Sequence, residues 1–279
     1  MRTRVRTLIF CLLACTIAAA PAHAQYGANR RQSDLATGET YHVEAAGTIW
    51  NPTPDIVISS QSLGIPGSEI DFVNTLGIEK SAFKQLKLAL RPARKHKFRF
   101  ELTPIHYLAQ QTLQTTFVFN GQRYNIGVPV STELKWNAYN FGYEWDFVYR
   151  NRGFAGVVAE AKYTDVTATL TANIVGSTGV EFTHARAPIP AIGGIGRVYV
   201  VPNISITGQF TMFKLPDKAV DTTDYSGKYY DFDLYGTINF NNYVGAQLGY
   251  RSFDVFYKVQ HDNGTMTLKG LYFGGVARF

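Results

Sequence analysis

The sequence predicts an all-β chain that closes into an antiparallel up-and-down transmembrane barrel of about ten strands, with eight or twelve as alternatives. Three observations predict this fold class. Apolar and polar residues alternate with a period of two in many segments, short and long connections alternate between those segments, and the chain ends in an alternating run that finishes on Phe279. Because 46% of the residues are hydrophobic and 14% are aromatic, the composition excludes a disordered chain.

The N-terminus has the pattern of a cleaved secretory signal peptide. Three arginines precede an apolar run over 8–20, and Ala22-His23-Ala24 supplies a small-x-small cleavage site. We therefore predict a signal peptide over 1–24, a polar periplasmic tether over 25–39 and a barrel domain over 40–279.

Both cysteines lie within the predicted signal peptide, so the mature chain is expected to have no disulfide and no thiolate metal site. Leu12-Leu13-Ala14-Cys15 loosely resembles a lipoprotein cleavage box. The alternative is therefore a lipid anchor on Cys15, which N-terminal sequencing of the mature protein would distinguish from a start at Gln25.

Ten segments have the alternation of strands with one apolar and one polar face. We expect strands at approximately 41–50, 84–92, 97–108, 130–148, 153–171, 185–200, 203–214, 228–239, 243–259 and 265–279. This alternation fits a soluble sandwich or barrel as well as a membrane barrel.

The connections favour the membrane barrel. Long connections are expected near 51–83, 109–129, 172–184 and 216–227, and they alternate with tight turns near 92–96, 149–152, 201–202 and 240–242. Short turns at one rim and longer loops at the other are typical of transmembrane barrels. Within the first long connection, 52–81, two short apolar stretches suggest that the loop folds over or into the barrel mouth.

Strand parity predicts which charges face the lumen. Tyr139, Phe141 and Trp145 share one face of their strand, whereas Glu144 and Asp146 share the other. Because a carboxylate facing lipid is costly, the acidic face is expected to point inward. The lumen-facing candidates are Glu44, Arg99, Glu101, Glu144, Asp146, Glu160, Lys162, Asp231, Asp233 and Arg251, joined by Arg278.

These mixed charges are expected to pair and fill a narrow lumen. We expect Arg99 and Lys162 to be the partners of Glu144 and Asp146, because their strands flank the strand that carries both carboxylates.

Several segments resemble a known family. They are Phe119-Asn120-Gly121 with Tyr124, Gly127 and Val130, the run 139–147, Gly249-Tyr250-Arg251 with Asp254-Val255, and Gly270-Leu271-Tyr272-Phe273-Gly274-Gly275. They resemble small single-chain bacterial outer-membrane β-barrel proteins. The alternating C-terminal strand, with Phe273 and the final Phe279, is similar to the signal that the assembly machinery of such barrels reads.

The resemblance implies a Gram-negative outer-membrane location. It also implies outer-membrane lipid, lipopolysaccharide and the barrel assembly machinery as partners. It implies little about activity. A nucleic-acid partner is not expected, because the chain is exported.

The residues supply no clear catalytic or metal-binding pattern, so no cofactor, no metal and no enzymatic activity are expected. The histidines after the signal peptide have no metal-ligand spacing, and neither a nucleophile elbow nor a phosphate loop occurs. His261-Asp262 lies in the last predicted loop, where a hairpin turn and a rim hydrolase are both open.

Three roles follow. The first is a structural or interaction barrel with a narrow, charge-filled lumen. The alternatives are a small-solute channel or porin, and a surface hydrolase that acts on peptides or lipid A.

Overall fold

The computed structural model describes residues 36–59, 67–119, 121–174, 177–220, 223–259 and 262–279. The predicted signal peptide and most of the predicted tether lie outside these residues. None of the described residues forms a helix that is long and apolar enough to cross a membrane.

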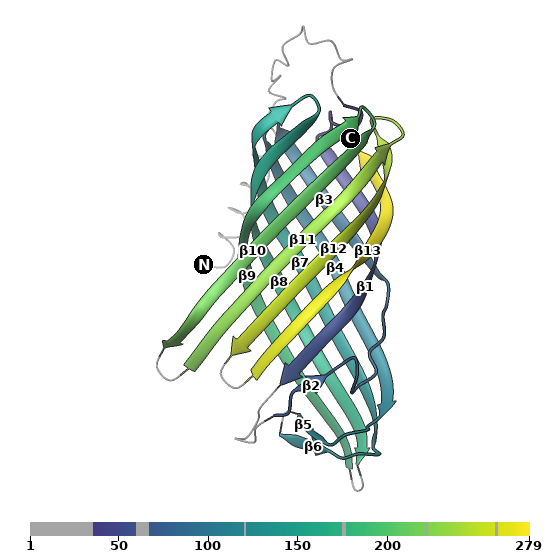
Figure 1. Ribbon diagram of the computed structural model, residues 1–279, viewed down its shortest axis with the longest axis vertical. Helices are drawn as coiled ribbons and strands as arrows, with labels where there is room; N and C mark the ends of the chain where they lie inside the picture. Colours follow the sequence, from purple (N-terminus) through teal and green to yellow (C-terminus); the bar gives the residue numbers. More distant parts are fainter. Residues whose placement is uncertain (1–35, 60–66, 120, 175–176, 221–222, 260–261) are drawn as a thin grey trace, which may run out of the picture. The chain divides into compact units, whose positions relative to one another are not determined.

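Ten long strands form one closed antiparallel barrel, which confirms the predicted fold class (Figure 1). The strands are β1 (Val43–Ser59), β3 (Phe83–Ala93), β4 (His96–Thr112), β7 (Pro129–Arg150), β8 (Gly153–Ile174), β9 (Ser177–Val201), β10 (Ile204–Val220), β11 (Thr223–Asn239), β12 (Val244–Val259) and β13 (Asp262–Arg278). Each pairs with its neighbours in chain order, and β13 pairs with β1 to close the barrel.

The two ends of the barrel differ. We call one end the terminal end, because the C-terminus lies there (Figure 1). Four tight turns lie at the same end, and residues 36–42 pack against it. At the other, the loop end, residues 67–82 carry the short strand β2 (Ile70–Asp71). The connection 113–128 contains a small hairpin of β5 (Phe117–Phe119) and β6 (Gln122–Tyr124).

Two of the predicted long loops are wrong. The range 172–184 is mostly strand, because β8 continues to Ile174 and β9 begins at Ser177. The range 216–227 is likewise mostly strand, because β10 and β11 extend through it. Strand pairing continues here beyond the apolar alternation, and threonine and valine in these ranges are residues that favour strands.

Both faces of the barrel wall change polarity along the strands. Towards the terminal end, the outer face of β7 carries exposed Tyr139, Phe141, Tyr143, Trp145 and Phe147, while its inner face carries buried carboxylates. Towards the loop end, the same outer face carries Glu133 and Lys135, while Leu134 and Trp136 are buried inside. We call these two parts the terminal half and the loop half.

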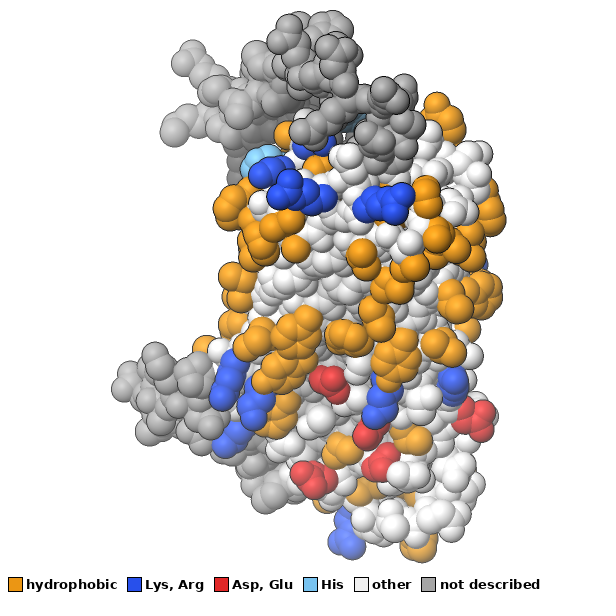
Figure 2. Space-filling model, turned by 45° about the horizontal axis from the view of Figure 1, so that its top comes forward, with side chains coloured by type: hydrophobic (Ala, Val, Ile, Leu, Met, Phe, Trp, Pro, Cys, Tyr) orange, Lys and Arg blue, Asp and Glu red, His pale blue; other side chains and the backbone are white. Residues whose placement is uncertain are grey.

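The terminal half is therefore built for an apolar surrounding and the loop half for water. Figure 2 shows the outer apolar side chains as a band, with Lys and Arg gathered at the terminal end and charges of both signs on the loop side. The stretch Tyr139–Phe147 matches the roughly 9–11 residues that a tilted strand needs to span a bilayer.

The barrel wall parts between β9 and β10. Their ladder runs from Val201–Ile204 to Ile192–Met212 and has no further pairs in the described strands, although both strands continue. Pro188 and Pro190 follow on β9 in the direction of the loop end, and proline has no N–H to donate to a ladder. The edge of β10 beyond Met212 is therefore unpaired on the β9 side.

Gly193 and Gly194 of β9 differ in how closely the neighbouring backbone approaches them. A Cβ on Gly193 would overlap the Phe210 carbonyl of β10, whereas a Cβ on Gly194 would meet nothing closer than the Gly156 oxygen, at 3.7 Å. Gly193→Ala is expected to cost about 1–3 kcal/mol of unfolding free energy through overpacking. Gly194→Ala should stay within about 0.5 kcal/mol. Urea unfolding of the folded barrel followed by tryptophan fluorescence measures both, and equal values would contradict the close approach of β10.

Candidate functional site

The lumen of the terminal half is filled by ion pairs whose charges balance. Among the described residues, these pairs join eight carboxylates to eight cations. The carboxylates are Glu39, Glu44, Glu101, Glu144, Asp146, Glu160, Asp231 and Asp233, and the cations are Lys87, Arg91, Lys97, Arg99, Lys162, Arg197, Arg251 and Arg278.

One cluster joins the neighbouring strands β4 and β7. Lys97 lies directly opposite Glu144 in the ladder, and its Nζ is 2.5 Å from Glu144 Oε1 and 2.9 Å from Asp146 Oδ2. Arg99 Nη1 reaches the other oxygen of Glu144 at 2.7 Å. Lys97, Glu144 and Asp146 are almost fully buried, so solvent does not stabilise the two carboxylates and their charge depends on the neighbouring cations.

A second cluster crosses the lumen between strands that are not neighbours. Lys162 Nζ on β8 is 2.7 Å from Asp231 Oδ2 on β11 and 3.0 Å from Glu160 Oε2. Arg251 on β12 donates to both oxygens of Asp231 and also to Glu101 on β4. These contacts tie opposite walls of the lumen together.

Lys87 makes a further brace across the lumen. Its Nζ is 2.6 Å from Asp233 Oδ2, so β3 is joined to β11. Tyr272 donates from its hydroxyl to the other oxygen of Asp233, at 2.7 Å, and the Lys87 ammonium lies 4.8 Å from the centre of the same ring.

The terminal end is closed by the segment that precedes β1. Glu39, 2% exposed, accepts a hydrogen bond from the Tyr199 hydroxyl at 2.9 Å and lies 3.4 Å from Arg197 Nη1. It also lies 3.6 Å from Arg91 Nη1. Residues 36–39 of the predicted tether are thus placed inside the barrel mouth.

Tyr41 and Glu44 complete this floor. Arg278 Nε donates to Glu44 Oε2 at 2.6 Å, and the Arg91 and Arg278 guanidinium groups lie 5.3 and 5.7 Å from the centre of the Tyr41 ring. Burial, followed by the charge of Glu44, raises the pKa of Tyr41 well above its ordinary value, so its hydroxyl stays neutral.

The loop half is filled by apolar side chains instead of charges. Its core cluster includes Ile56, Leu134, Trp136 and Leu268 from the strands. The two long connections add further members to this cluster, namely Ile70, Phe72, Leu76 and Ile78 from residues 67–82, and Phe117, Phe119 and Tyr124 from the β5–β6 hairpin. The first connection therefore packs into the barrel mouth, as its apolar stretches predict.

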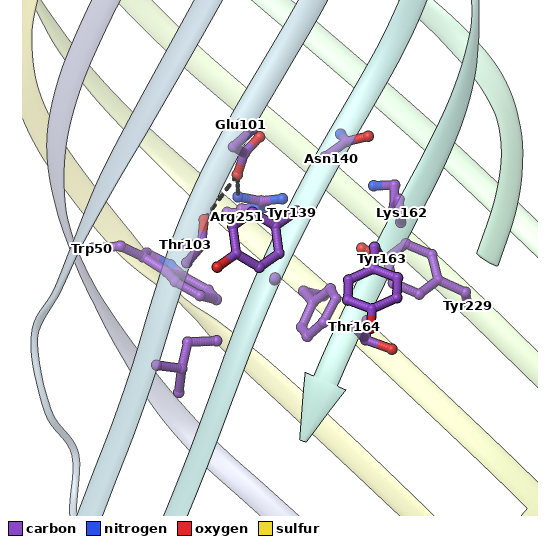
Figure 3. A pocket seen from close by; sticks show the side chains of 13 residues that line it. Trp50, Glu101, Thr103, Tyr139, Asn140, Lys162, Tyr163, Thr164, Tyr229 and Arg251 are labelled. Atoms are coloured by element: carbon purple, nitrogen blue, oxygen red, sulfur yellow. Dashed lines mark hydrogen bonds and ion pairs between the residues drawn. The ribbon is translucent and has the colours of Figure 1, made fainter. Parts of the chain in front are cut away.

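A small cavity lies where the charged and apolar layers meet. Its volume is about 30 Å³, and its lining includes Trp50, Glu101, Lys162, Tyr229 and Arg251 (Figure 3). A cavity of this size is large enough for water and too small for a solute of many heavy atoms.

The ten lumen-facing candidates all lie in these clusters, and seven of them are at most 8% exposed. Phe273 and Phe279 lie on the outside, 60% and 73% exposed.

One expected pairing is wrong. Arg99 does bind Glu144, but Lys162 binds Glu160 and Asp231 instead of Glu144 or Asp146. In the β7–β8 register, Lys162 lies opposite Asn140 and Val158 lies opposite Glu144. The strand tilt therefore carries Lys162 away from this pair.

Sequence reasoning missed five of the sixteen charges, namely Glu39, Lys87, Arg91, Lys97 and Arg197. Lys97 has the same strand parity as Arg99 and was available from that signal. Strand parity could not identify Glu39, because this residue precedes the first alternating segment.

The described part of the loop half contains one histidine–carboxylate pair. His106 Nε2 lies 2.8 Å from Glu133 Oε1, and Lys135 Nζ lies 2.7 Å from the same oxygen. All three side chains are on the outer face of the wall, and no nucleophile accompanies them in these contacts. His261 lies outside the described residues, and those residues contain no group of three potential metal ligands.

Comparison with known proteins supports the fold. No protein-family model matches the chain, and no curated protein matches it. Among solved structures, the chain is similar to the outer membrane protease OmpT from Escherichia coli, with a TM-score of 0.58 and 10% identity over 88% of this chain and 99% of OmpT.

A more distant similarity is to Ail of Yersinia pestis, with a TM-score of 0.35 and 9% identity over 84% of this chain and 99% of Ail. Another is to the toluene transporter TodX of P. putida, with a TM-score of 0.34 and 10% identity over 88% of this chain and 94% of TodX. At 10% identity, the likeness to OmpT shows the fold alone. The chain has the fold of outer-membrane β-barrels.

Proposed function

We propose that this chain is a non-conducting outer-membrane barrel with a structural or interaction role. The observation that carries the proposal is the filled lumen, in which cross-braced ion pairs occupy the terminal half and an apolar plug occupies the loop half. In this orientation the terminal end faces the periplasm, the apolar belt lies in the membrane, and the loop half stands in water outside the cell.

The loop half supports the interaction role. Its wall of β4, β7 and β8 presents Gln110, Ser131, Glu133, Thr169 and Thr171 around a shallow depression on the outer face. Outer-membrane lipid, lipopolysaccharide and the barrel assembly machinery are the partners that this placement requires. The role needs no catalytic group.

Conductance separates the proposal from the channel alternative. The chain without its predicted signal peptide, folded and inserted into planar bilayers, is expected to give no single-channel steps, because ion pairs cross the lumen of the terminal half and apolar side chains fill that of the loop half. A porin inserted in parallel shows that the bilayer reports open channels. Heat-modifiable gel mobility shows that the protein added is folded. Regular ohmic steps from the folded protein would overturn the proposal.

A further inference from the structure

Two lysines of neighbouring strands lie directly opposite each other on the outer wall. Lys214 of β10 is the direct ladder partner of Lys228 of β11, and both side chains are exposed. Like charges directly opposite on one face of a sheet are destabilising. No salt bridge joins either lysine to another residue whose side chain the structure describes, and the outward Asp254 on the next strand accepts hydrogen bonds from Ser252 and Thr267.

The lysine pair lies at the border of the apolar belt. Going towards the terminal end, the next outward residues are Met212, 41% exposed, on β10 and Tyr230 on β11, and the rings of Phe210 and Tyr230 stack with centroids 6.4 Å apart. Figure 2 shows charged side chains of both signs beside the apolar band on its loop side. Where the lysine pair adjoins the belt, the wall has the polarity of a lipid whose headgroup is anionic.

The strand ladder ends close to the pair. The last described β9–β10 pair is Ile192–Met212, so Lys214 lies just past the last paired residue of β10 on that side. On the other side, Lys228 Nζ lies 5.7 Å from the centre of the Phe256 ring, which gives the site an aromatic wall.

We propose that Lys214 and Lys228 bind the phosphate of an outer-leaflet glycolipid whose acyl chains lie against Phe210, Met212 and Tyr230. The proposal rests on the proposed function, since it needs the apolar belt to lie in the outer membrane with the loop half outside the cell. Bound phosphate would offset the repulsion between the two ammonium groups, which no described carboxylate pairs with.

The test measures glycolipid binding to the delipidated, folded full chain by native mass spectrometry. Diphosphorylated lipid A is the probe, and fully dephosphorylated lipid A and phosphatidylglycerol are the comparison lipids. Lys214→Gln with Lys228→Gln is expected to weaken lipid A binding about thirtyfold, because each lysine near an anionic surface contributes about a factor of five.

The chain offers a matched control. Lys84 and Lys269 are exposed, outward and next to the belt, but they lie opposite uncharged Ile49, Thr53 and Ser252. Lys84→Gln with Lys269→Gln should change binding by no more than about twofold, since both lie on strands other than β10 and β11 and a phosphate held by Lys214 and Lys228 is screened from them. An equal loss in both double variants, or equal binding of dephosphorylated lipid A or phosphatidylglycerol, would overturn the site.

A second readout needs no lipid. Removing one of two repelling charges should leave the free energy of unfolding of the lipid-free protein unchanged or slightly higher in the Lys228→Gln variant. A loss of stability there would show that the pair is structural and would overturn the proposal. Bilayer currents measured on the same preparations distinguish the glycolipid site from the non-conducting role. A barrel that conducts no current and binds all three lipids equally would refute the glycolipid site and leave the non-conducting role standing.

Discussion

Replacing Lys97 with methionine is expected to destabilise the barrel by about 3–5 kcal/mol, because it leaves two buried carboxylates without their shared cation. Lys97 is 1% exposed, and its Nζ lies within 2.9 Å of both Glu144 and Asp146. Equilibrium unfolding in urea, followed by the shift in gel mobility, measures the loss. The shape of the side chain is largely kept, so the change isolates the charge.

A second variant separates charge from packing. In Lys97→Met with Asp146→Asn, Glu144 keeps Arg99 at 2.7 Å and the other carboxylate is neutral, so much of the lost stability should return. Lys84→Met, on the exposed outer face, should stay within about 0.5 kcal/mol. A Lys97→Met protein as stable as wild type would show that this cluster does not hold β4 to β7. A double variant with a lower free energy of unfolding than Lys97→Met alone would show the same.

The other large effect is expected in the loop half. Trp136 is 1% exposed, and its ring lies 4.7 Å from that of Phe253, which joins opposite walls of the apolar plug. Trp136→Ala removes this contact and is expected to cost about 3–5 kcal/mol. Because the plug and the ion pairs occupy different halves, limited proteolysis should cut within 67–82 and 113–128 while the terminal half stays protected.

Leu108→Ala is the control for this variant. Leu108 is 69% exposed on the outer face of β4, so its truncation should leave both unfolding and proteolysis close to wild type. Cleavage of the terminal half at the same rate as the loops would contradict the division of the barrel into two separately filled halves.

The period-two alternation was enough to predict the closed barrel and the inward direction of the ten candidate charges, because parity fixes the face of every residue on a strand. It did not predict the pairing of Lys162, since partners across a lumen depend on tilt and stagger, which a single strand does not encode. The register of β7 against β8 shifts between Trp145 and Val148, which strand parity alone does not show.

The change of polarity along each strand was also missed. An alternating strand keeps its period when the two faces exchange character, so the run from Leu134 to Phe147 reads as one pattern although its inner face changes from apolar to charged. The length of the strands was underestimated for the same reason, because the polar outer residues of the loop half read as loop.

The balanced lumen constrains the order in which the barrel is assembled. Lys87 and Asp233 are 146 residues apart in the chain, Glu101 and Arg251 are 150 apart, and Glu44 on the first strand waits for Arg278, the penultimate residue. A partly built sheet would carry unmatched charges into hydrocarbon, at several kcal/mol for each. The hairpins therefore gain little by entering the bilayer one at a time. Because Glu44 meets Arg278 only when β1 pairs with β13, neutralisation of the lumen is expected to be complete only when the barrel closes.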